Sequence, residues 1–320
     1  MSLPSATTWS RTRAPTRISI RSPSAGNPAR PGSRTEPAER GRVDLQNIGG
    51  GRRVALSRTF DEDAELYDRA RPGYPSELFD DLAELAGIGR GCRLLEVGAG
   101  TGKATVPLAE RGCRITAVEL GEAMAAVAWR NLAGFGAVEV ITSDFESWPL
   151  PKEPFDAVVS ATAFHWIDPA VRLAKAADAL RPGGALAVIA THHVAGGSEE
   201  FFVEVQDCYE RFDPATPPGL RLPAADDVDT SDYTDEVADS GRFGPVVSRR
   251  YAWDLTYTTV EYLEVLRTYS GHRALPPAAR EGLLGCIAAL IDTRYGGRVT
   301  KRYLTELRVS RRPSRTPQSF

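Results

Sequence analysis

Three glycines at alternate positions mark the part of this chain best suited to bind a ligand. Gly98, Gly100 and Gly102 follow a short apolar run, and Glu96 stands two residues before the first of them. Glycine has no Cβ, so a main chain built this way can turn tightly and pass close to a ligand. The apolar run 94–97 predicts a buried parallel strand, and the pattern after Gly102 predicts a helix. A glycine turn between such a strand and a helix is where doubly wound α/β domains bind their cofactor.

The spacing of the glycines distinguishes two kinds of cofactor site. Turns that bind dinucleotides have the pattern G-x-G-x-x-G, whereas here the third glycine, Gly102, comes one residue earlier. The same spacing also occurs in ordinary tight turns. The residues that follow the next strands must therefore identify the ligand, because the carboxyl ends of parallel strands meet at one edge of the sheet.

Polar and aromatic residues follow each of the next three predicted strands. The strands are expected over 114–119, 138–143 and 155–161. The residues that end or follow them are Glu119 and Leu120, Asp144 and Phe145, and His165 and Trp166. A fifth apolar strand is predicted over 185–190, after the turn Pro182-Gly183-Gly184. Together these segments place carboxylates, aromatic rings and an imidazole around the glycine turn.

In this order, the segments resemble class I S-adenosylmethionine-dependent methyltransferases, whose first motif has the pattern E/D-x-G-x-G-x-G. The resemblance covers about a hundred residues. It implies an α/β fold with a Rossmann-like, seven-stranded, doubly wound sheet, an antiparallel last strand and a helical cap. It also implies S-adenosyl-L-methionine as the cofactor and S-adenosyl-L-homocysteine as the product.

The resemblance assigns a role to the residues at this edge. The glycine turn would pack against the amino acid end of the cofactor, and Glu119 would accept hydrogen bonds from both ribose hydroxyls. Glu96, as part of the same motif, belongs to the expected cofactor-binding set. Asp144 would take the adenine amine, while the main-chain N–H of Phe145 would meet a ring nitrogen. Two alternatives stay open, a solvated Glu119 and a Phe145 ring that is an ordinary core aromatic. The expected cofactor-binding set is completed by Leu120 and Trp166.

A second similarity lies ahead of the glycine turn. The run 60–75 resembles the F-D-x-x-A-x-x-Y-x-x-x-R-P-x-Y-P segment of a methyltransferase subset that includes trans-aconitate methyltransferase-like proteins. In that subset the segment lies over the cofactor as a lid. Tyr67 and Arg71 would then meet the methionine carboxylate or an anionic substrate. The alternative is a surface helix with a stacked Tyr–Arg pair.

Histidines near the same edge are candidates for contact with the methyl acceptor. Methyl transfer from a sulfonium is a direct in-line displacement, so a general base is needed only when the acceptor must lose a proton. His165 is the candidate base, since its pKa class suits proton removal near neutral pH, and the alternative is that it lines the cofactor pocket. His192 and His193 follow the fifth strand and could line the substrate side. His272 and Arg273 could bind a substrate carboxylate, or they could be cations at a helix C-terminus.

The two resemblances together imply a methyltransferase that acts on a small molecule, and the similarity to the trans-aconitate group favours a carboxylate acceptor over a hydroxyl or a carbon. Two other functions stay open. One is a protein of the same fold that binds the cofactor without turnover. The other is a nicotinamide-dependent oxidoreductase.

Charge is distributed unevenly along the 320 residues, whose formal net charge is −3. Residues 1–57 hold ten arginines and three acids, so this segment carries about +7 and the remainder about −10. The acidic remainder argues against nucleic acid as a partner. The Arg-, Pro- and Ser-rich segment 1–57 is expected to be a disordered basic extension. A targeting peptide and a start codon placed too far upstream are the alternatives.

Residues 58–320 are expected to form one methyltransferase domain. Cap elements are predicted at 58–75, 195–245 and 259–298, with helical patterns at 259–268 and 277–293. Two late strands, over 249–257 and 301–310, are expected as the antiparallel sixth and seventh strands of the sheet. Elaborations of this size usually carry specificity in enzymes built on a common scaffold.

The cysteines and histidines are scattered along the chain. Cys92, Cys113, Cys208 and Cys286 include no C-x-x-C pair, so neither a metal site nor a disulfide framework is expected. No apolar run reaches the roughly 18–20 residues that would span a bilayer. The sequence therefore predicts a soluble protein of a reducing cytoplasm, a monomer or homodimer whose partner is a small molecule.

Overall fold

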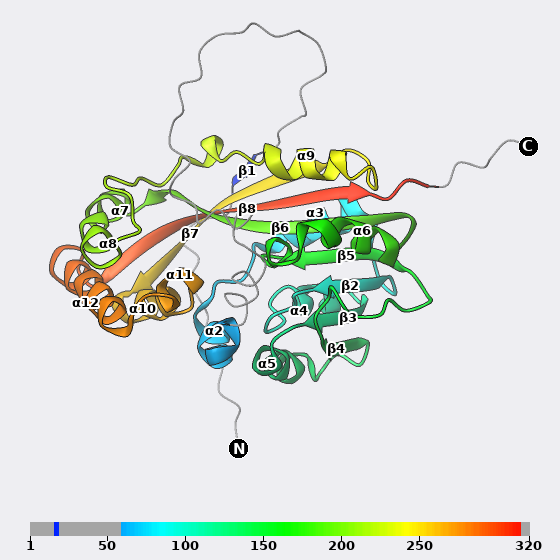
Figure 1. Cartoon of the computed structure of the whole chain (residues 1–320), viewed down its shortest axis with the longest axis horizontal. Coiled ribbons are helices and arrows are strands. Elements are labelled where there is room, and N and C mark those ends of the chain that lie inside the picture. Colours follow the sequence, from blue (N-terminus) through cyan, green and yellow to red (C-terminus); the bar gives the residue numbers. More distant parts are fainter. Residues whose placement is uncertain (1–15, 19–58, 315–320) are drawn as a thin grey trace, which may run out of the picture.

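A mixed β-sheet with helices on both faces organises the chain (Figure 1). The computed structural model describes residues 16–18 and 59–314. The sheet has eight strands in the order β1-β7-β8-β6-β5-β2-β3-β4. The strands are β1 (Thr16–Ile18), β2 (Arg93–Val97), β3 (Arg114–Glu119), β4 (Val138–Thr142), β5 (Phe155–Ala161), β6 (Leu180–Gly197), β7 (Val247–Thr258) and β8 (Arg298–Arg311).

The helices connect and cover these strands. Those before β6 are η1 (Thr59–Asp63), α2 (Ala64–Ala70), α3 (Ser76–Ala86), α4 (Thr105–Glu110), α5 (Glu122–Leu132), η2 (Phe164–Trp166) and α6 (Pro169–Ala179). Those after β6 are α7 (Glu199–Glu204), α8 (Gln206–Phe212), η3 (Ala225–Asp227), α9 (Ser231–Asp239), α10 (Thr259–Arg267), α11 (Ser270–Arg273) and α12 (Pro277–Arg294).

Capping side chains define where several helices begin. Asp63 accepts a hydrogen bond from the main-chain N–H of Leu66 and so caps α2. Asp168 does the same for α6, whose first residue is a proline. Thr258 and Glu261 form a reciprocal capping box at α10. These contacts satisfy main-chain N–H groups that have no partner inside the helix.

Five parallel strands carry the predicted α/β fold. β4, β3, β2, β5 and β6 pair in parallel, and apolar residues fill both faces of the central strands. Leu94 packs into a core with α3 and α4, while its neighbour Leu95 packs into a core with α6 and α9. This alternation buries both faces, as expected for a parallel sheet. The Rossmann-like fold class is confirmed.

β8, the last strand along the chain, lies between β7 and β6 in the sheet. β8 is antiparallel to both β6 and β7, so it runs against the five parallel strands. β7 therefore runs in the same direction as the five parallel strands. The expected antiparallel last strand is confirmed, but the expectation that the sixth strand is also reversed is wrong. The reason is that β8 returns through the middle of the sheet instead of adding at its edge.

A short strand outside the expected domain completes the sheet. β1 pairs antiparallel with β7, with Arg17 opposite Tyr251. The expectation that residues 1–57 are disordered is therefore wrong for Thr16–Ile18, because β7 is an edge strand whose main-chain groups accept a partner. The rest of the expected extension lies outside the described residues.

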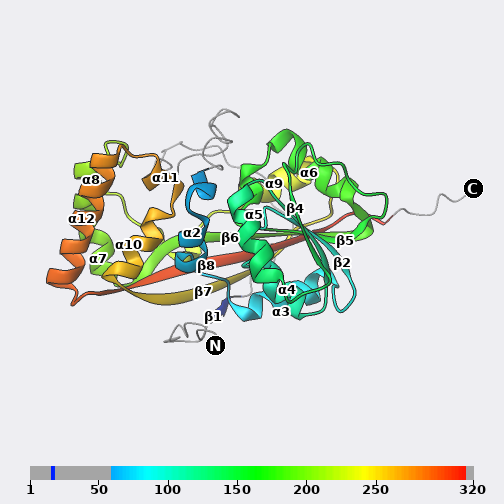
Figure 2. The same ribbon diagram turned by 90° about the horizontal axis from the view of Figure 1, so that it is seen from below.

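Three long strands carry a second group of helices beyond the parallel part of the sheet. β6, β7 and β8 have 18, 12 and 14 residues, against five to seven for β2 to β5. Their far ends support α7, α8, α10, α11 and α12 (Figure 2). The side chains of this lobe form a separate core that includes Phe201, Leu283 and Tyr303. We call these helices and strand ends the cap lobe.

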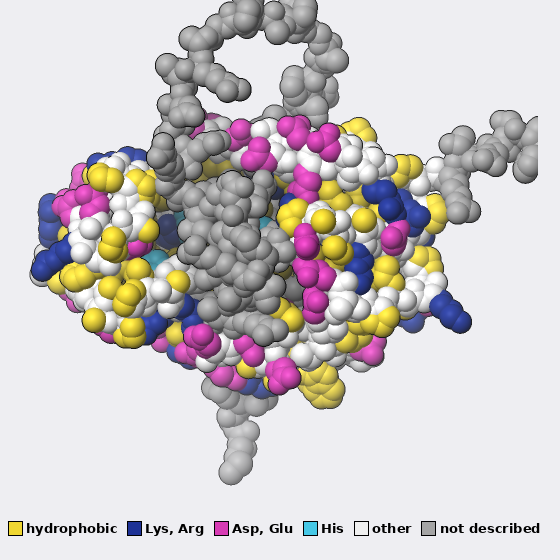
Figure 3. Space-filling model, viewed as in Figure 1, with side chains coloured by type: hydrophobic (Ala, Val, Ile, Leu, Met, Phe, Trp, Pro, Cys, Tyr) yellow, Lys and Arg dark blue, Asp and Glu magenta, His cyan; other side chains and the backbone are white. Residues whose placement is uncertain are grey.

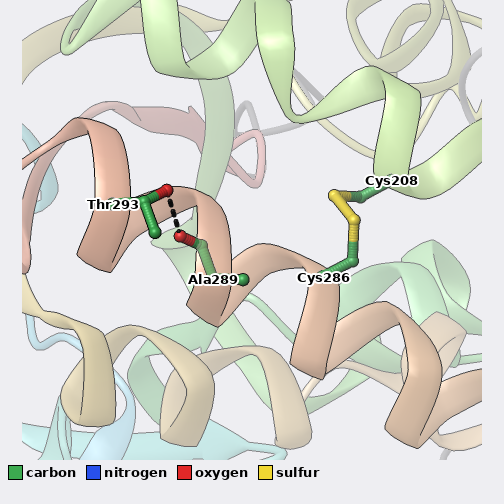
Figure 4. Close-up of a disulfide and its surroundings, with 4 residues drawn as sticks. All are labelled: Cys208, Cys286, Ala289 and Thr293. Atoms are coloured by element: carbon green, nitrogen blue, oxygen red, sulfur yellow. Dashed lines mark hydrogen bonds between the residues drawn. A yellow bond between two sulfur atoms is a disulfide. The ribbon is translucent and has the colours of Figure 1, made fainter.

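A disulfide joins two helices of the cap lobe. Cys208 of α8 is bonded to Cys286 of α12 (Figure 4). The expectation against disulfides is wrong here, because the two cysteines are 78 residues apart and meet only when the two helices pack. Among residues 16–18 and 59–314, no helix combines the length and apolar character needed to cross a membrane.

Candidate active site

The glycine turn is packed tightly against the end of β5. Gly98 has φ of +70° and donates a hydrogen bond from its N–H to Val118 O at 2.8 Å. A Cβ at this position would lie 2.4 Å from Ala163 Cβ. Only glycine fits this backbone and this contact. At Gly100, by contrast, a Cβ would meet only the tip of Met124, at 3.5 Å.

A cavity lies between the glycine turn, the α2 segment and the cap lobe. It contains about 690 Å³ of empty space, part of it open to solvent. The glycine turn and the residues around it contribute Glu96, Gly98, Ala99, Gly100, Thr101, Lys103 and Ala104. The other walls contain Tyr67, Arg71, Pro72, Gly73, Tyr74, Ala161, Thr162, Thr191, His193, Tyr269 and Tyr303. The cavity therefore has one wall from the parallel sheet and another from the cap lobe.

Glu96 is a buried acid at the base of this cavity. It is 1% exposed, and neither carboxylate oxygen makes a full hydrogen bond within the described part of the chain. Burial raises the pKa of Glu96 to about 8; the Glu119 charge adds to the rise, and the nearby Thr105 hydroxyl offsets part of it. A buried, unpaired carboxyl group is costly for a fold to keep. Its place in the cavity wall fits a positively charged ligand group.

Glu119 ties the end of β3 to the glycine turn. Its Oε2 accepts a hydrogen bond from Gly100 N at 2.8 Å, and its Oε1 accepts one from Gly121 N at 2.9 Å. Burial raises the pKa of this carboxyl group, while the hydrogen bonds lower it. Each oxygen keeps a lone pair for a ligand hydroxyl. Glu119 is a neighbour of the cavity wall and is not among the residues that line it.

Arg71, at the C-terminal end of α2, stacks against two tyrosines. The Arg71 guanidinium lies 4.3 Å from the Tyr269 ring centre and 5.3 Å from that of Tyr67. Its Nη2 donates to Thr268 O at 3.1 Å, and its Nε has no partner in the described residues. The guanidinium thus retains a donor beside the cavity. Stacking of this kind holds a cation in place without neutralising it.

Contacts on three sides hold the η1–α2 segment, predicted to be a lid, over the site. Asp61 Oδ1 accepts a hydrogen bond from Met124 N at 2.9 Å, where α5 begins. Lys103 Nζ donates to Asp68 O at 2.7 Å. Arg69 pairs with Glu264 of α10 at 2.9 Å. The segment therefore bridges the parallel part of the sheet and the cap lobe.

Two adjacent histidines point to opposite faces of β6. His193 lines the cavity and contacts the rings of Tyr269 and Tyr303, with ring centres at 5.3 and 5.9 Å. Desolvation in these surroundings, together with the positive charges of Lys301 and Arg71, lowers its pKa well below 6.5. His192 lies on the other face, with Nε2 3.7 Å from Glu306. His192, expected on the substrate side, therefore does not line this cavity, because side chains alternate along a strand.

His165 and Trp166 occupy the short helix η2 that follows β5. Their ring centres are 4.9 Å apart, and Trp166 meets Phe60 of η1 at 5.6 Å. Phe60 in turn contacts the ring of Tyr67 at 5.9 Å. A row of aromatic rings therefore links η2 to the segment predicted as a lid. Neither residue is among those that line the cavity.

The remaining cofactor candidates lie around the turn at the ends of β3 and β4. Asp144 Oδ1 accepts a hydrogen bond from Glu146 N at 2.9 Å. Phe145 is 5% exposed and packs in the core beneath α6, which is the alternative left open for its ring. Leu120 is 36% exposed. Gly102 closes the glycine turn with φ of +89°.

The two cap residues expected to bind substrate are engaged elsewhere. His272 Nε2 is 3.0 Å from the hydroxyl of Tyr209, and burial lowers its pKa to about 4. Arg273 donates to Glu62 at 2.9 Å and to Arg267 O at 3.4 Å. Neither lines the cavity in the described structure, so the structure does not bring them into the site. They link α11 to α8, η1 and α10 instead.

Several cavity residues were missed by the sequence patterns. Tyr74 lies within the R-P-x-Y-P run, so a signal for it was present, and its hydroxyl is 3.0 Å from that of Thr162. Tyr269 and Tyr303 had no local signal. Tyr303 reaches the cavity because β8 lies beside β6, and Tyr269 because it precedes α11 in the cap lobe.

Comparisons with known proteins agree with this geometry. Residues 95–188 match the family model described as a methyltransferase domain. An uncharacterized methyltransferase of Mycobacterium tuberculosis is 38% identical over 138 residues, which cover 42% of this chain and 52% of that protein. A demethylmenaquinone methyltransferase of Clavibacter sepedonicus is 30% identical over 152 residues, covering 46% of this chain and 60% of that protein. The chain thus spans about half the length of the first of these relatives.

Solved structures with a similar arrangement have low sequence identity. The YcgJ protein of Bacillus subtilis is 17% identical with a TM-score of 0.48, over 74% of this chain and 99% of that one. A phosphoethanolamine N-methyltransferase 2 of Haemonchus contortus is 16% identical with a TM-score of 0.48, over 83% of this chain and 61% of that one. The family match over 95–188 spans the strands and turns that surround the glycine turn. Together with the order of the motifs in this chain and the topology of its sheet, this family match identifies this part of the chain as a class I S-adenosylmethionine-dependent methyltransferase domain.

Proposed function

We propose that this protein transfers a methyl group from S-adenosylmethionine to a small-molecule acceptor. The observation that carries this proposal is the unpaired carboxyl group of Glu96, 1% exposed, at the base of a cavity formed partly by the glycine turn. The methionine end of S-adenosylmethionine carries an ammonium group that would pair with it. That pairing would offset the cost of a buried acid.

The other cavity residues fit the rest of the cofactor. Arg71 keeps an unpartnered Nε beside the cavity, which suits the methionine carboxylate. Glu119 would accept from the ribose hydroxyls through the lone pairs left by its main-chain hydrogen bonds. Asp144 and the main chain of Phe145 would meet the adenine, and Trp166 would close that side together with Phe60.

When bound, S-adenosylmethionine supplies an electrophilic methyl group, so the chain chiefly orients the acceptor and excludes water. Orientation of this kind can contribute roughly 7–11 kcal/mol to lowering a barrier. The segment predicted as a lid and the cap lobe would provide that enclosure. The ion pair between Arg69 of α2 and Glu264 of α10 joins this segment to the cap lobe.

We favour a carboxylate as the methyl acceptor. A carboxylate is already a nucleophile at neutral pH and needs no base, and Lys103 gives the cavity a second cation besides Arg71. His193 is the alternative base to His165 if the acceptor is a hydroxyl, because a lowered pKa keeps its imidazole neutral and able to take a proton. Of the two, His193 is the one that lines the cavity.

The expected partner is a small molecule and not a nucleic acid. In the part of the face that Figure 3 shows in colour, acidic side chains are interspersed with Lys and Arg, without a continuous basic surface. The acidic balance outside residues 1–57 supports the same view. A cytoplasmic location and a monomeric or homodimeric state remain predictions.

A methyl-transfer assay tests the proposal. The purified protein is incubated with methyl-labelled S-adenosylmethionine and, separately, with a panel of carboxylic acids, a panel of phenols and alcohols, and a cell extract. We expect a labelled small molecule whose label is released by mild base, as for a methyl ester. A base-stable product would identify a hydroxyl or carbon acceptor. Cofactor binding without any labelled product would favour a binding protein without turnover.

A further inference from the structure

A second pair of cysteines lies in contact at the end of the sheet away from the cavity. Cys92 immediately precedes β2 and Cys113 immediately precedes β3, so both stand at the amino ends of neighbouring strands. Their sulfur atoms are 3.0 Å apart. The glycine turn follows the other end of β2. The pair is therefore separate from the proposed methyl-transfer site.

The strand register suits a bond between these two residues. Arg93 and Arg114, the next residues along, are register partners in parallel strands, and Arg114 N donates to Cys92 O at 2.8 Å. Neighbouring strands lie about 4.8 Å apart, which is within the Cα spacing of roughly 4.4–6.8 Å that a disulfide requires. The sulfur atoms would have to approach by about 1 Å to reach a bond length of about 2.05 Å. With this spacing of the main chains, rotation of the two side chains would be enough to close that gap.

The two thiols differ in exposure and acidity. Cys92 is partly exposed, whereas Cys113 is 2% exposed. Contact with Cys113 lowers the pKa of the Cys92 thiol to about 7, against the effect of burial and of Asp156. The same contact and burial raise the pKa of Cys113, although Arg111 nearby lowers it slightly. The accessible sulfur is therefore the better nucleophile, and the inner thiol is placed to react second.

We propose that Cys92 and Cys113 form a thiol–disulfide exchange site for low-molecular-weight disulfides of the glutathione type. The Cys92 thiolate attacks one sulfur of the small disulfide, whose S–S bond breaks, and the first small thiol leaves and takes up a proton. Cys113 then loses its proton to solvent and attacks Cys92 Sγ, which releases the second small thiol. Two electrons pass from the cysteine pair to the small disulfide, and the chain gains a Cys92–Cys113 bond.

Peptide mapping of the full chain tests this site. The protein, with its Cys208–Cys286 bond intact, is incubated with oxidised glutathione at pH 7.5, acid-quenched, alkylated in urea and digested. We expect the wild type to lose both alkylatable thiols and to yield a peptide pair linked through Cys92 and Cys113. Cys113→Ser is expected to stop with glutathione attached to Cys92. Cys92→Ser is expected to keep Cys113 unmodified in the folded state and to react only in urea.

Three outcomes would overturn the proposal. They are a wild type that keeps both thiols, a wild type that keeps glutathione on Cys92 as the Cys113→Ser variant does, and a folded Cys92→Ser variant that reacts as fast as Cys113→Ser. Thermal unfolding of each variant checks that it is folded. Because the pair lies at the other end of β2, S-adenosylhomocysteine should bind the oxidised and reduced proteins equally.

Discussion

Glu119 Oε2 accepts a hydrogen bond from the main-chain N–H of Gly100 at 2.8 Å, so the end of β3 holds the glycine turn. The second oxygen accepts from Gly121 N, where α5 begins. One carboxylate therefore fixes two turns on the cofactor side of the sheet. Each oxygen keeps a lone pair that a ligand hydroxyl could use.

Replacing this carboxylate should weaken cofactor binding. In Glu119→Ala the hydrogen bonds to a charged group are lost, which costs roughly 1.5–3 kcal/mol, or about 10- to 150-fold in the dissociation constant of S-adenosylhomocysteine. Calorimetric titration with S-adenosylhomocysteine measures this dissociation constant. Glu139→Ala, which removes an exposed carboxylate from β4, is the matched control and should bind normally. If both variants bind with equal affinity, Glu119 does not contact the cofactor.

Cofactor binding should release a proton through Glu96. Burial holds its pKa at about 8, so the group is mostly protonated at pH 7 and must ionise when an ammonium pairs with it. The apparent enthalpy of binding S-adenosylhomocysteine at pH 7 should then vary with the ionisation enthalpy of the buffer. Glu96→Gln should abolish this variation. Methylthioadenosine, which lacks the ammonium, should show none even with the wild type; a buffer dependence with that ligand would contradict the pairing.

Two glycines of the same turn should respond differently to alanine. At Gly98 a Cβ would lie 2.4 Å from Ala163 Cβ, so Gly98→Ala should destabilise the fold by several kcal/mol, as overpacking and a positive φ combine. At Gly100 the added Cβ meets only Met124 at 3.5 Å, so Gly100→Ala should fold with a penalty of about 1–2 kcal/mol but bind S-adenosylhomocysteine poorly. Urea unfolding and titration separate the two effects. Gly89→Ala, with no atom within 4 Å, is the control, and normal binding by Gly100→Ala would argue against the placement of the ligand.

The pH dependence of stability should contain a contribution from His272. Its folded pKa is about 4 and the ordinary value is 6.5, so the unfolded chain binds the proton more tightly. The contribution is therefore fully present above pH 6.5 and is lost as the pH falls toward 4. His272→Gln should reduce the slope of the unfolding free energy against pH in this window; integrated over the window, the difference should be roughly 3 kcal/mol. Tyr209→Phe removes the hydroxyl partner, keeps the imidazole and should keep the slope; a flat Tyr209→Phe profile would assign the effect to the hydrogen bond instead.

The disulfide of the cap lobe should contribute to stability. The bond closes a loop with a sequence separation of 78 residues between α8 and α12, and removing such bonds typically costs 2–4 kcal/mol. Urea unfolding of Cys208→Ser/Cys286→Ser should show a loss of about that size. Addition of a reductant should lower the stability of the wild type to the same level. If the double variant is as stable as the wild type, the cap lobe does not depend on this bond.

Local patterns were sufficient to predict the parallel half of the fold. The strand before Gly98, the turn itself and Glu119 all follow from apolar runs and glycine spacing within a few dozen residues. The choice between His192 and His193 could not be made this way. The fifth strand was expected to end near 190, but β6 continues to Gly197, and one residue decides which face a side chain occupies.

Contacts between distant segments account for what the sequence did not reveal. Tyr303 reaches the cavity because β8 enters between β6 and β7, and no local pattern encodes that insertion. Cys208 and Cys286 meet through the packing of α8 on α12. His272 and Arg273 had the right chemistry for a substrate carboxylate, yet Tyr209 and Glu62 already engage them. Residue type alone cannot show which partners the fold supplies.

Titration of the purified protein with S-adenosylhomocysteine and, separately, with NAD shows which of the two cofactors the cavity beside the glycine turn binds. We expect one S-adenosylhomocysteine to bind per chain, more weakly in both Glu96→Gln and Glu119→Ala and unchanged in Glu139→Ala, with NAD binding much more weakly or not at all. Tighter binding of NAD than of S-adenosylhomocysteine, or an affinity indifferent to Glu96 and Glu119, would contradict this expectation.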